Sequence, residues 1–389
     1  MMISIQEALQ IVDEQQTLLK VHQLSVEESL GFYIAEEIQA PFDLPSFDNS
    51  AMDGYAVCGI SEHYEVIGEI QAGNISEFHL SAGEAVRIFT GAKVPSSASA
   101  VVMQEQTEVK GKELSVLASI SEGQNIRRKG NELRKGDSVF LPGKLINPTT
   151  VGLLTSLGLT SISVYKKPIV RIISTGDELI PAGNALQEGQ IYESNSSTLA
   201  SVMQKFGFDC SEKSHLKDDF ELIKTNIGKA VDSSDVLLLS GGISVGDYDF
   251  VRQALIESGV QELFYRVLQK PGKPLYFGRK DDTFVFALPG NPASSLTCFY
   301  VYVFPLLQKL SGAKDTGLMR VNVPLAHDYT MKTDRPSFLK AKIEYQKISI
   351  LDGQASSMIH SMSMANALCF MHQKGEYRSG DLVECLIID

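Results

Sequence analysis

Apolar residues change their spacing several times along the chain, and each change predicts a different kind of structure. Near the N-terminus, Ile5, Leu9 and Val12 recur at helical spacing. Two serines precede a glutamate by three residues, as in a capping box: Ser4 with Glu7, and Ser25 with Glu28. We therefore predict that residues 1–40 form a few short helices.

A β-prone pattern replaces the helical one after residue 50. Short runs such as AVRIF and ELSVLASI are separated by Gly, Ser and Asn turns, which is typical of a small β-rich unit. Residues 147–159 return to a helical pattern, with Thr149 or Thr150 near the cap, and we expect this helix to pack with the N-terminal helices. The sequence thus predicts a discontinuous helical domain, 1–50 and 141–166, interrupted by a β-rich domain, 51–140.

Residues 167–312 alternate strands and helices. PIVRIIST and DVLLLS are continuous apolar runs of the kind that parallel sheets bury on both faces. PLYFG and TFVFALPG predict a hairpin that turns at 279–282. These units indicate an α/β domain with an open, doubly wound, mostly parallel sheet. Residues 313–389 alternate again and predict a small β-barrel or sandwich, so the fold class is multi-domain α/β.

Composition narrows the class of protein. Of the 389 residues 43% are hydrophobic, and the formal net charge is -12. The apolar content excludes a disordered chain, and the acidic balance argues against a nucleic-acid partner. No stretch approaches the roughly 18 apolar residues of a membrane span, and no export signal is evident. The five cysteines are dispersed without a CxxC pair, as expected of reduced thiols in a cytoplasmic protein.

Four loops follow strands of the doubly wound sheet, where such sheets bind ligands. They are TGDE at 175–178, GGISVGDYD at 241–249, KPGKP at 270–274 and LPGNP at 288–292. Glycines let backbone N–H groups approach anionic oxygens, and Lys270 and Lys273 add positive charge. Four acids offer the oxygen ligands that Mg²⁺ prefers: Asp177, Glu178, Asp247 and Asp249. The loops together predict a site for phosphoanhydride or phosphoryl chemistry.

Each of these features also has a purely structural interpretation. A Gly-Gly pair after a strand is often only a turn, and an acid such as Asp177 or Asp218 often caps a helix. Asp53 and Thr90 in the β-rich region are an acid and a hydroxyl donor on exposed loops, or simply turn residues. The basic run at 125–130 is more simply a solvated hairpin face. The chain has neither a Walker sequence nor GxGxxG, and a serine nucleophile has no nearby histidine.

Long segments, in order and spacing, resemble the molybdopterin molybdenumtransferase family (the MoeA family, related to the E domain of gephyrin). The resemblance spans nearly the whole chain. The segments are FDNSAMDGYAV (47–57), FTGAKVP (89–95), STGDEL (174–179), GQIYESNS (189–196), LSGGISVGDYD (239–249), KPGKPLYFG (270–278) and LPGNPASS (288–295).

The resemblance implies molybdenum cofactor biosynthesis: Mg²⁺-dependent insertion of molybdate into adenylylated molybdopterin, with release of AMP. It implies an elongated homodimer of four-domain subunits, with each active cleft between the sheet domain of one subunit and the β-rich domain of the other. The implied catalytic residues are Asp53, Thr90, Glu178, Asp235 and Asp249. The implied substrate-binding residues are Gly241, Gly242, Ser244, Lys270, Lys273, Pro289 and Ser294. The implied Mg²⁺ ligands are Asp177, Glu178, Asp247 and Asp249.

The last domain departs from the family pattern. The family often has Gly-Arg followed by a second arginine, whereas this chain has Asp334 before Arg335 and Lys340 at the later position. Lysine cannot bind an oxyanion through two parallel hydrogen bonds, which weakens the case for a molybdate contact by Lys340.

Two other functions stay open on the sequence. The first is the related adenylyltransferase that prepares the adenylylated pterin, whose fold-mates carry a Thr-Gly-Gly-Thr-Gly loop where this chain has Ser-Gly-Gly-Ile-Ser at 240–244. That enzyme is also a candidate partner. The second is a non-catalytic pterin-binding scaffold, against which the intact acids and lysines argue.

Overall fold

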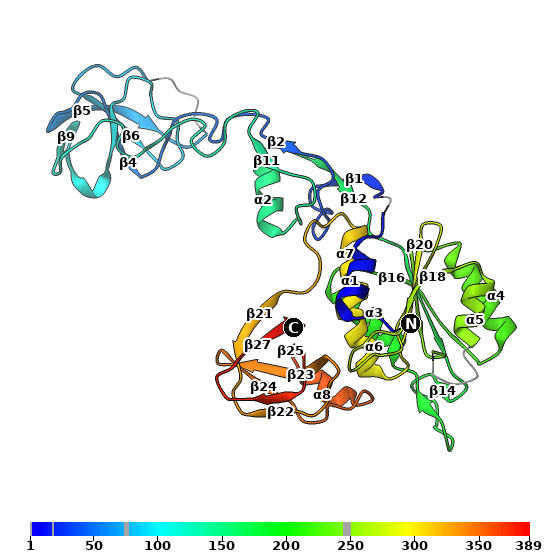
Figure 1. Ribbon diagram of the computed structural model, residues 1–389. Helices are drawn as coiled ribbons and strands as arrows, with labels where there is room; N and C mark the ends of the chain where they lie inside the picture. Colours follow the sequence, from blue (N-terminus) through cyan, green and yellow to red (C-terminus); the bar gives the residue numbers. More distant parts are fainter. Residues whose placement is uncertain (1, 18, 74–77, 244–249) are drawn as a thin grey trace.

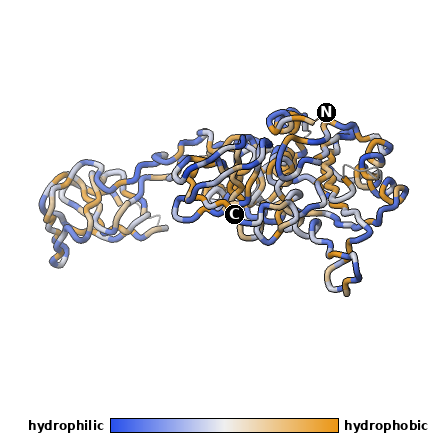
Figure 2. Tube along the Cα trace, turned by 60° about the horizontal axis from the view of Figure 1, so that its bottom comes forward, coloured by the Kyte–Doolittle hydropathy of each residue, from blue (hydrophilic) through white to orange (hydrophobic). Residues whose placement is uncertain are grey.

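The computed structural model describes residues 2–17, 19–73, 78–243 and 250–389. The molecule is elongated, with a β-rich unit at one end, a small linking unit next to it, and the α/β unit beside the C-terminal unit at the other end (Figure 1). The turned view of Figure 2 also shows the β-rich unit at one end of the molecule. This is the multi-domain α/β architecture expected from the sequence. In the described ranges, no helix has the length and apolar content to cross a membrane.

A six-stranded sheet forms the centre of the α/β unit. β13 (Val170–Thr175) lies between β16 (Cys210–Leu216) and β17 (Val236–Ser240), and β17 pairs with β20 (Thr283–Leu288), all in parallel. The order is β16-β13-β17-β20-β19-β18, in which the last two are antiparallel neighbours, β19 (Tyr276–Lys280) and β18 (Gln261–Tyr265). Because β19 opposes both of its neighbours, β18 runs in the same direction as β20. The carboxyl ends of these parallel strands therefore meet at one edge, as the sequence predicted.

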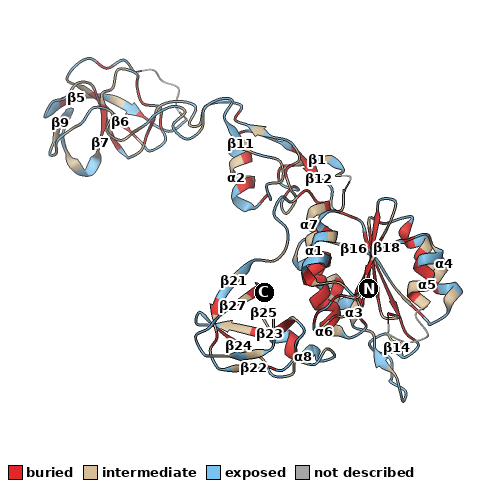
Figure 3. Cartoon of the chain, viewed as in Figure 1, coloured by how far each residue is buried: buried red, intermediate tan, exposed pale blue. Residues whose placement is uncertain are grey.

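Helices cover both faces of this sheet, and its central strands are buried throughout (Figure 3). Every residue of β17 and β20 is buried, which explains their uninterrupted apolar sequences. One face carries α4 (Phe220–Val231) and α5 (Phe250–Glu257). The other carries α1 (Ile5–Asp13), α3 (Asn195–Lys205), α6 (Pro292–Cys298) and α7 (Phe304–Leu310), with a π-helix at Phe299–Val303 between the last two. A short arm, β14 (Leu179–Ile180) with β15 (Ile191–Tyr192), projects from the unit.

The N-terminal helix belongs to this unit. Ser4 and Glu7 form the predicted capping box, and Ile5, Ala8 and Val12 enter the same core as the sheet. The expectation that α1 packs with the helix near residue 150 is wrong. The apolar stripe of α1 instead enters the core of the α/β unit, where α1 packs beside α7.

The linking unit contains far less helix than predicted. β1 (Val21–Ser25) pairs with β12 (Ser161–Tyr165) in an antiparallel ladder, and β2 (Ile38–Gln39) pairs with β11 (Ser138–Phe140). The only helix in its described residues is α2 (Pro148–Ser156), which Asn147 caps by accepting the Thr150 N–H at 2.9 Å. Thr149 and Thr150 lie near this cap, as predicted, and both hydroxyls donate to Asn147 Oδ1. The prediction that the unit is mainly helical is wrong.

The second capping-box sequence does not start a helix. Ser25 accepts the Glu28 N–H at 3.2 Å and donates its hydroxyl to the Glu28 carboxylate at 2.7 Å, but a turn follows. The turn ends at Gly31, whose φ of +78° is left-handed. A single turn forms too few hydrogen bonds to offset the cost of helix nucleation. The domain boundaries within 1–166 stay a prediction.

The β-rich unit contains a six-stranded sheet with apolar clusters on both faces. The order is β7-β4-β6-β5-β9-β8. Its strands are β4 (Gly54–Val57), β5 (His63–Ile70), β6 (Glu84–Ile88), β7 (Ala100–Met103), β8 (Thr107–Lys110) and β9 (Glu113–Val116). A smaller ladder joins β3 (Asn49–Ser50) to β10 (Ile126–Arg127). The β-rich character of this region is confirmed.

The C-terminal unit is a small curled sheet in the order β21-β27-β25-β23-β24. Its strands are β21 (Arg320–Pro324), β23 (Ser337–Glu344), β24 (Lys347–Ile350), β25 (Ala367–Met371) and β27 (Leu382–Ile387). A bridge between Leu325 and Ile348 joins the two edges. A second ladder, β22 (Tyr329–Met331) with β26 (Gly375–Tyr377), and the short helix α8 (Ile359–Ser363) complete the unit.

Lys340 is buried inside this unit. Its side chain is 3% exposed, and its ammonium donates to the carbonyl oxygens of Gly353 (2.6 Å), Ala355 (3.0 Å) and Met358 (3.1 Å). Burial lowers the pKa of this lysine. The ammonium thus uses its three N–H donors on carbonyls of the 353–358 loop. Lys340 therefore has a structural role and no donor left for an oxyanion.

Replacing Lys340 should destabilise the C-terminal unit. Lys340→Met removes three charge-assisted hydrogen bonds from the 353–358 loop, whose carbonyls then keep the Met358 N–H and the Ser361 hydroxyl as donors. We expect a loss of about 2–4 kcal/mol in the free energy of unfolding, measured by urea denaturation with circular dichroism. Lys342→Met is the control, because Lys342 is a partly exposed neighbour that pairs with Glu344. It should change stability by less than about 0.5 kcal/mol. Equal stability of the two variants would contradict the structural role.

Candidate functional site

The loops that follow β13, β17 and β20 touch one another at the carboxyl edge of the sheet. Gly241 has a φ of +95°, and a Cβ placed there would lie 2.4 Å from the Thr175 carbonyl oxygen. A Cβ on Gly290 would lie 3.7 Å from the Cα of Gly241. At Gly242, a Cβ would meet Val251 at 2.4 Å and the Thr175 hydroxyl at 2.8 Å. Only glycine fits the close approach at 241 and 242, and the predicted meeting of these loops is found.

Asn195 ties two of these loops together. It stands at the start of α3, and its Nδ2 donates to the Ser240 hydroxyl at 2.8 Å and to the Gly290 carbonyl at 2.7 Å. The Gly290 carbonyl can only accept, so it fixes the orientation of the amide. Asn195 was not among the predicted site residues, although it lies in the GQIYESNS segment. Its Oδ1 and the buried Thr175 Oγ1 have no hydrogen-bond partner in the described part of the chain.

The lysine loop, 270–274, follows β18 and so begins at the same edge. Its backbone packs on α6: a Cβ at Gly272, where φ is +86°, would lie 2.4 Å from Cys298 Sγ. The Lys270 side chain is exposed and that of Lys273 is partly buried. Ser294 is only 2% exposed, and its carbonyl oxygen lies 3.7 Å from the same Cβ position. The lysines and Ser294 are therefore close in space, as predicted, with Ser294 buried in the helix that supports the loop.

The C-terminal unit holds the outer side of the lysine loop. The Lys270 N–H donates to the Pro336 carbonyl at 2.9 Å, and the Phe338 N–H donates to the Lys270 carbonyl at 2.8 Å. Ser356 of the same unit contacts the start of α6, because its hydroxyl accepts from Asn291 Nδ2 at 2.9 Å. Arg335 is exposed and directly precedes Pro336, so its backbone lies close to that of Lys270. The position of the lysine loop depends on two units.

Three carboxylates follow the strands next to the glycine loops. Asp177 and Glu178 are exposed after β13, and the Asp218 N–H donates to Asp177 Oδ1 at 3.2 Å. Burial, followed by the negative charges of Asp177 and Glu178, raises the pKa of Asp218. Asp219, not Asp218, caps α4 by accepting the Leu222 N–H at 2.7 Å. Asp218 is therefore a further acid of this edge that the sequence analysis treated as a helix cap.

The described acids fit a magnesium ion only in part. In residues 2–17, 19–73, 78–243 and 250–389, no three His, Cys, Asp or Glu side chains form a complete metal site. Mg²⁺ commonly takes one or two carboxylates and completes its shell with water and substrate phosphates. Asp177 and Glu178 are suitable donors of that kind. Three predicted residues, Ser244, Asp247 and Asp249, lie outside the described residues.

Asp235 does not lie at this edge. It directly precedes β17 and so stands at the amino end of the parallel strands, opposite the glycine loops. Its carboxylate pairs with Lys20 Nζ at 2.9 Å and accepts the Ile169 N–H at 2.8 Å. Lys20 and Ile169 lie on the two chain segments that connect the sheet to the linking unit. The prediction that Asp235 belongs to the catalytic cleft is wrong, because its carboxylate joins these connections.

Asp53 and Thr90 meet each other, in the β-rich unit. The Thr90 N–H and hydroxyl both donate to Asp53 Oδ1, at 2.8 and 2.7 Å. These bonds, the backbone one first, lower the pKa of Asp53. Figure 1 shows the β-rich unit at the far end of the molecule from α6 and the sheet. Within one chain, the pair and the sheet loops are therefore two separate sets of residues.

Comparison with known proteins shows the same division into parts. A model of the MoeA N-terminal region (domain I and II) matches residues 3–158, a probable molybdopterin binding domain matches 171–309, and the MoeA C-terminal region (domain IV) matches 322–388. The sheet with its carboxyl-edge loops thus belongs to the molybdopterin-binding class of α/β domains.

Relatives extend the match to the whole chain. A molybdopterin molybdenumtransferase of Staphylococcus epidermidis is 31% identical over 402 residues, covering 100% of this chain and 96% of the relative. One of Staphylococcus aureus is 32% identical over 349 residues, covering 87% and 83%. The crystal structure of the molybdopterin biosynthesis MoeA protein from Pyrococcus horikoshii OT3 superimposes with a TM-score of 0.86 at 30% identity over both full chains. The chain belongs to the MoeA family, which confirms the resemblance in its sequence.

Removing the Thr90 hydroxyl should raise the pKa of Asp53. Thr90→Val deletes one of the two hydrogen bonds to the Asp53 carboxylate but keeps the backbone N–H, the larger cause of the shift. We expect the pKa to move up while staying below its ordinary value, measured by ¹³C NMR titration of the carboxyl group. A carboxylate with a depressed pKa stabilises the fold above its ordinary pKa, and that stabilisation disappears as the pH falls through the folded-state pKa. An unchanged Asp53 titration would show that the hydroxyl contact is absent in solution.

Proposed function

We propose that this protein is a molybdopterin molybdenumtransferase, which inserts molybdate into adenylylated molybdopterin with Mg²⁺ and releases AMP. The observation that carries the proposal is the gathering of glycine loops, acids and the lysine loop at one edge of the sheet. The curated relatives that match most of the chain have this name. Membership of the MoeA family places the protein in molybdenum cofactor biosynthesis.

The glycine loops and the lysine loop bind the phosphate groups of the substrate in this proposal. Gly241 and Gly242 have no side chain to keep an anion away from the backbone. Lys270 and Lys273 supply two positive charges from the same loop, and their flexible ammonium groups suit a phosphate, which binds a point charge well. Asn195 contributes by holding the loops of Ser240 and Gly290 together.

Asp177 and Glu178 are the described residues that would hold Mg²⁺. Burial first, and then the negative charges of Asp177 and Glu178, raise the pKa of Asp218, so three acids stand together where a cation would be favoured. When bound, the ion supplies stabilisation of the charge that develops on the phosphate of the departing AMP. Asp247 and Asp249 stay candidate ligands on sequence grounds.

Sulfur for molybdenum comes from the substrate in this proposal. Cys298, Cys369 and Cys385 are buried, and the remaining two cysteines are only partly accessible. Burial raises the pKa of the Cys298 thiol, so it stays protonated and is a poor metal ligand. The dithiolene of the pterin is thus the expected ligand of the incoming molybdate.

A second copy of the chain supplies Asp53 and Thr90 to each cleft. The pair lies far from its own sheet edge, so a single elongated subunit cannot place it near the lysine loop (Figure 1). In a two-fold symmetric dimer, each subunit contributes Asp53 and Thr90 to the cleft of its partner and receives the same pair in its own cleft. In this arrangement the extended shape of each subunit brings its β-rich unit to the cleft of the partner.

Direct turnover tests the activity. Purified protein is mixed with adenylylated molybdopterin, molybdate and MgCl₂, and AMP is followed by chromatography. We expect AMP release that depends on molybdate and stops with EDTA. Formation of adenylylated pterin from ATP would point instead to the adenylyltransferase. Pterin binding without either reaction would indicate a scaffold and contradict the proposal.

Mixing two inactive variants tests the shared cleft. Asp53→Ala and Lys273→Ala should each abolish turnover, because each damages both clefts of its own homodimer. Randomly mixed subunits should regain roughly a quarter of the wild-type activity, since half the dimers are mixed and each has one intact cleft.

The matched control mixes Asp53→Ala with Thr90→Ala. Both variants damage the same part of the cleft, so no mixed dimer has an intact one, and activity should stay absent. Failure of the Asp53→Ala and Lys273→Ala mixture to regain activity, in dimers shown to exchange subunits, would rule out the shared cleft.

A further inference from the structure

A buried polar cluster lies beneath the lysine loop. Gln269 and Tyr302 are both 0% exposed. The Tyr302 hydroxyl donates to Gln269 Oε1 at 2.5 Å, and Gln269 Nε2 donates to the Gly272 carbonyl at 3.2 Å. Cys298, also 0% exposed, accepts from the same Nε2 at 3.5 Å. The cluster thus joins the helix below to the loop backbone between the two lysines.

The location of this cluster is unusual for polar groups. The surrounding residues, such as Phe299 and Leu296, belong to the main apolar core. A buried amide or hydroxyl costs free energy unless it is paired, and an apolar pair of similar size is the simpler solution. Tyr302 also lies in the π-helix at Phe299–Val303. π-Helices are rare overall, and those that occur are often found at functional sites.

The hydrogen bonds of the cluster have a fixed direction. The Gly272 carbonyl can only accept, so Gln269 must present its NH₂ group to the loop and its oxygen to Tyr302. The chain of donors runs from Tyr302 to Gln269 to Gly272. At Gly272 the loop approaches so closely that a Cβ would lie 2.4 Å from Cys298 Sγ. These contacts fix how far the loop stands from the helix.

We infer that Gln269 and Tyr302 are positioning residues for the lysine loop: they set where the ammonium groups of Lys270 and Lys273 stand over the sheet edge. The inference rests on the proposed function for the role of those lysines as phosphate ligands. Neither residue touches substrate. Their effect reaches it through the Gly272 carbonyl, which lies between the two lysines in the chain.

Two variants separate positioning from core stability. Tyr302→Phe leaves the Gln269 oxygen unpaired in a dry core, so the free energy of unfolding should fall. Adding Gln269→Leu replaces both partners by apolar groups, and stability should recover toward the wild type. In the double variant the Gly272 carbonyl has lost the Gln269 amide and keeps only the weak donor of the Cys298 thiol, 3.8 Å away. We therefore expect the KM for adenylylated molybdopterin to stay about five- to tenfold raised there, with kcat little changed, because uniform binding of the phosphate is lost.

A second measurement does not require activity. The Lys273 carbonyl accepts the N–H groups of Val267 and Leu275, both at 3.0 Å. If the cluster holds the loop, these two amides should exchange hydrogen at least about tenfold faster in the double variant. The backbone amide of Leu238 in β17 should keep its wild-type exchange rate.

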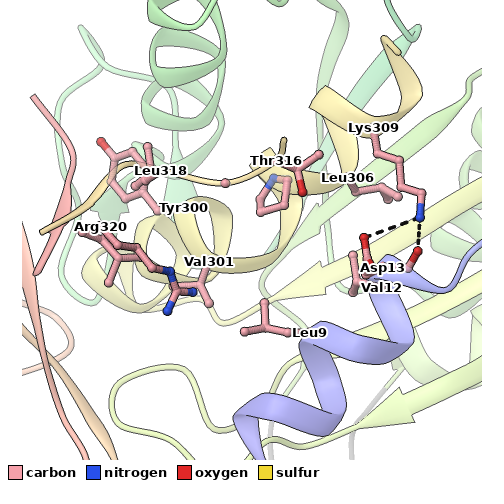
Figure 4. A pocket seen from close by; sticks show the side chains of 13 residues that line it. Leu9, Val12, Asp13, Tyr300, Val301, Leu306, Lys309, Thr316, Leu318 and Arg320 are labelled. Atoms are coloured by element: carbon pink, nitrogen blue, oxygen red, sulfur yellow. Dashed lines mark hydrogen bonds and ion pairs between the residues drawn. The ribbon is translucent and has the colours of Figure 1, made fainter. Parts of the chain in front are cut away.

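Tyr300→Phe is the matched control, two residues away on the same π-helix. Tyr300 faces the other way: with Leu9 and Leu318 it lines a cavity of about 150 Å³ between α1 and the segment before β21 (Figure 4). The same loss of a hydroxyl there should change neither KM nor the exchange of Val267 and Leu275.

The outcomes distinguish the two proposals. Wild-type KM and wild-type exchange at Val267 and Leu275 in a stable double variant would reduce the cluster to core packing and overturn the inference. Faster exchange in the double variant, together with a wild-type protein that releases no AMP, would support the positioning role and reject the proposed reaction. Faster exchange together with the raised KM supports both.

Discussion

Parallel pairing of β13, β17 and β20 is the constraint on which the rest of the structure depends. It brings three loops to one edge, and the glycines at 241 and 242 let those loops approach within van der Waals contact. β18 runs the same way, so the lysine loop begins at this edge too. Anionic ligands need backbone N–H groups and positive charge at one place, and this topology supplies both from segments far apart in sequence.

A second constraint is the length of the molecule. Asp53 and Thr90 are joined by two hydrogen bonds in a unit that stands far from the sheet (Figure 1). Asp235, at the opposite end of β17, holds the two chain segments that lead toward that unit. These contacts lie at the amino edge of the sheet, while the chemistry we propose takes place at the carboxyl edge.

Local sequence predicted those parts of the structure that local physics decides. The buried strands, the hairpin at 279–282 and the cap of α1 at Ser4 follow from apolar runs, turn residues and a capping box, and the structure contains all of them. The same capping signature at Ser25 failed because only one turn follows before Gly31. Asp235 was misplaced because its role was inferred from the family resemblance alone, although its position directly before β17 puts it at the amino end of that strand. Gln269 was missed because its side-chain partners, Tyr302 and Cys298, are distant in the chain, and no spacing rule reveals a contact between residue 269 and residue 302.

The central claim is that one edge of the sheet binds the phosphate of the adenylyl group. A crystal structure of the protein with AMP and Mg²⁺ tests it most directly. The account predicts the phosphate within hydrogen-bonding distance of the Lys273 ammonium and of the backbone at Gly241 and Gly242. A phosphate bound at the amino edge, or inside the β-rich unit alone, would contradict it.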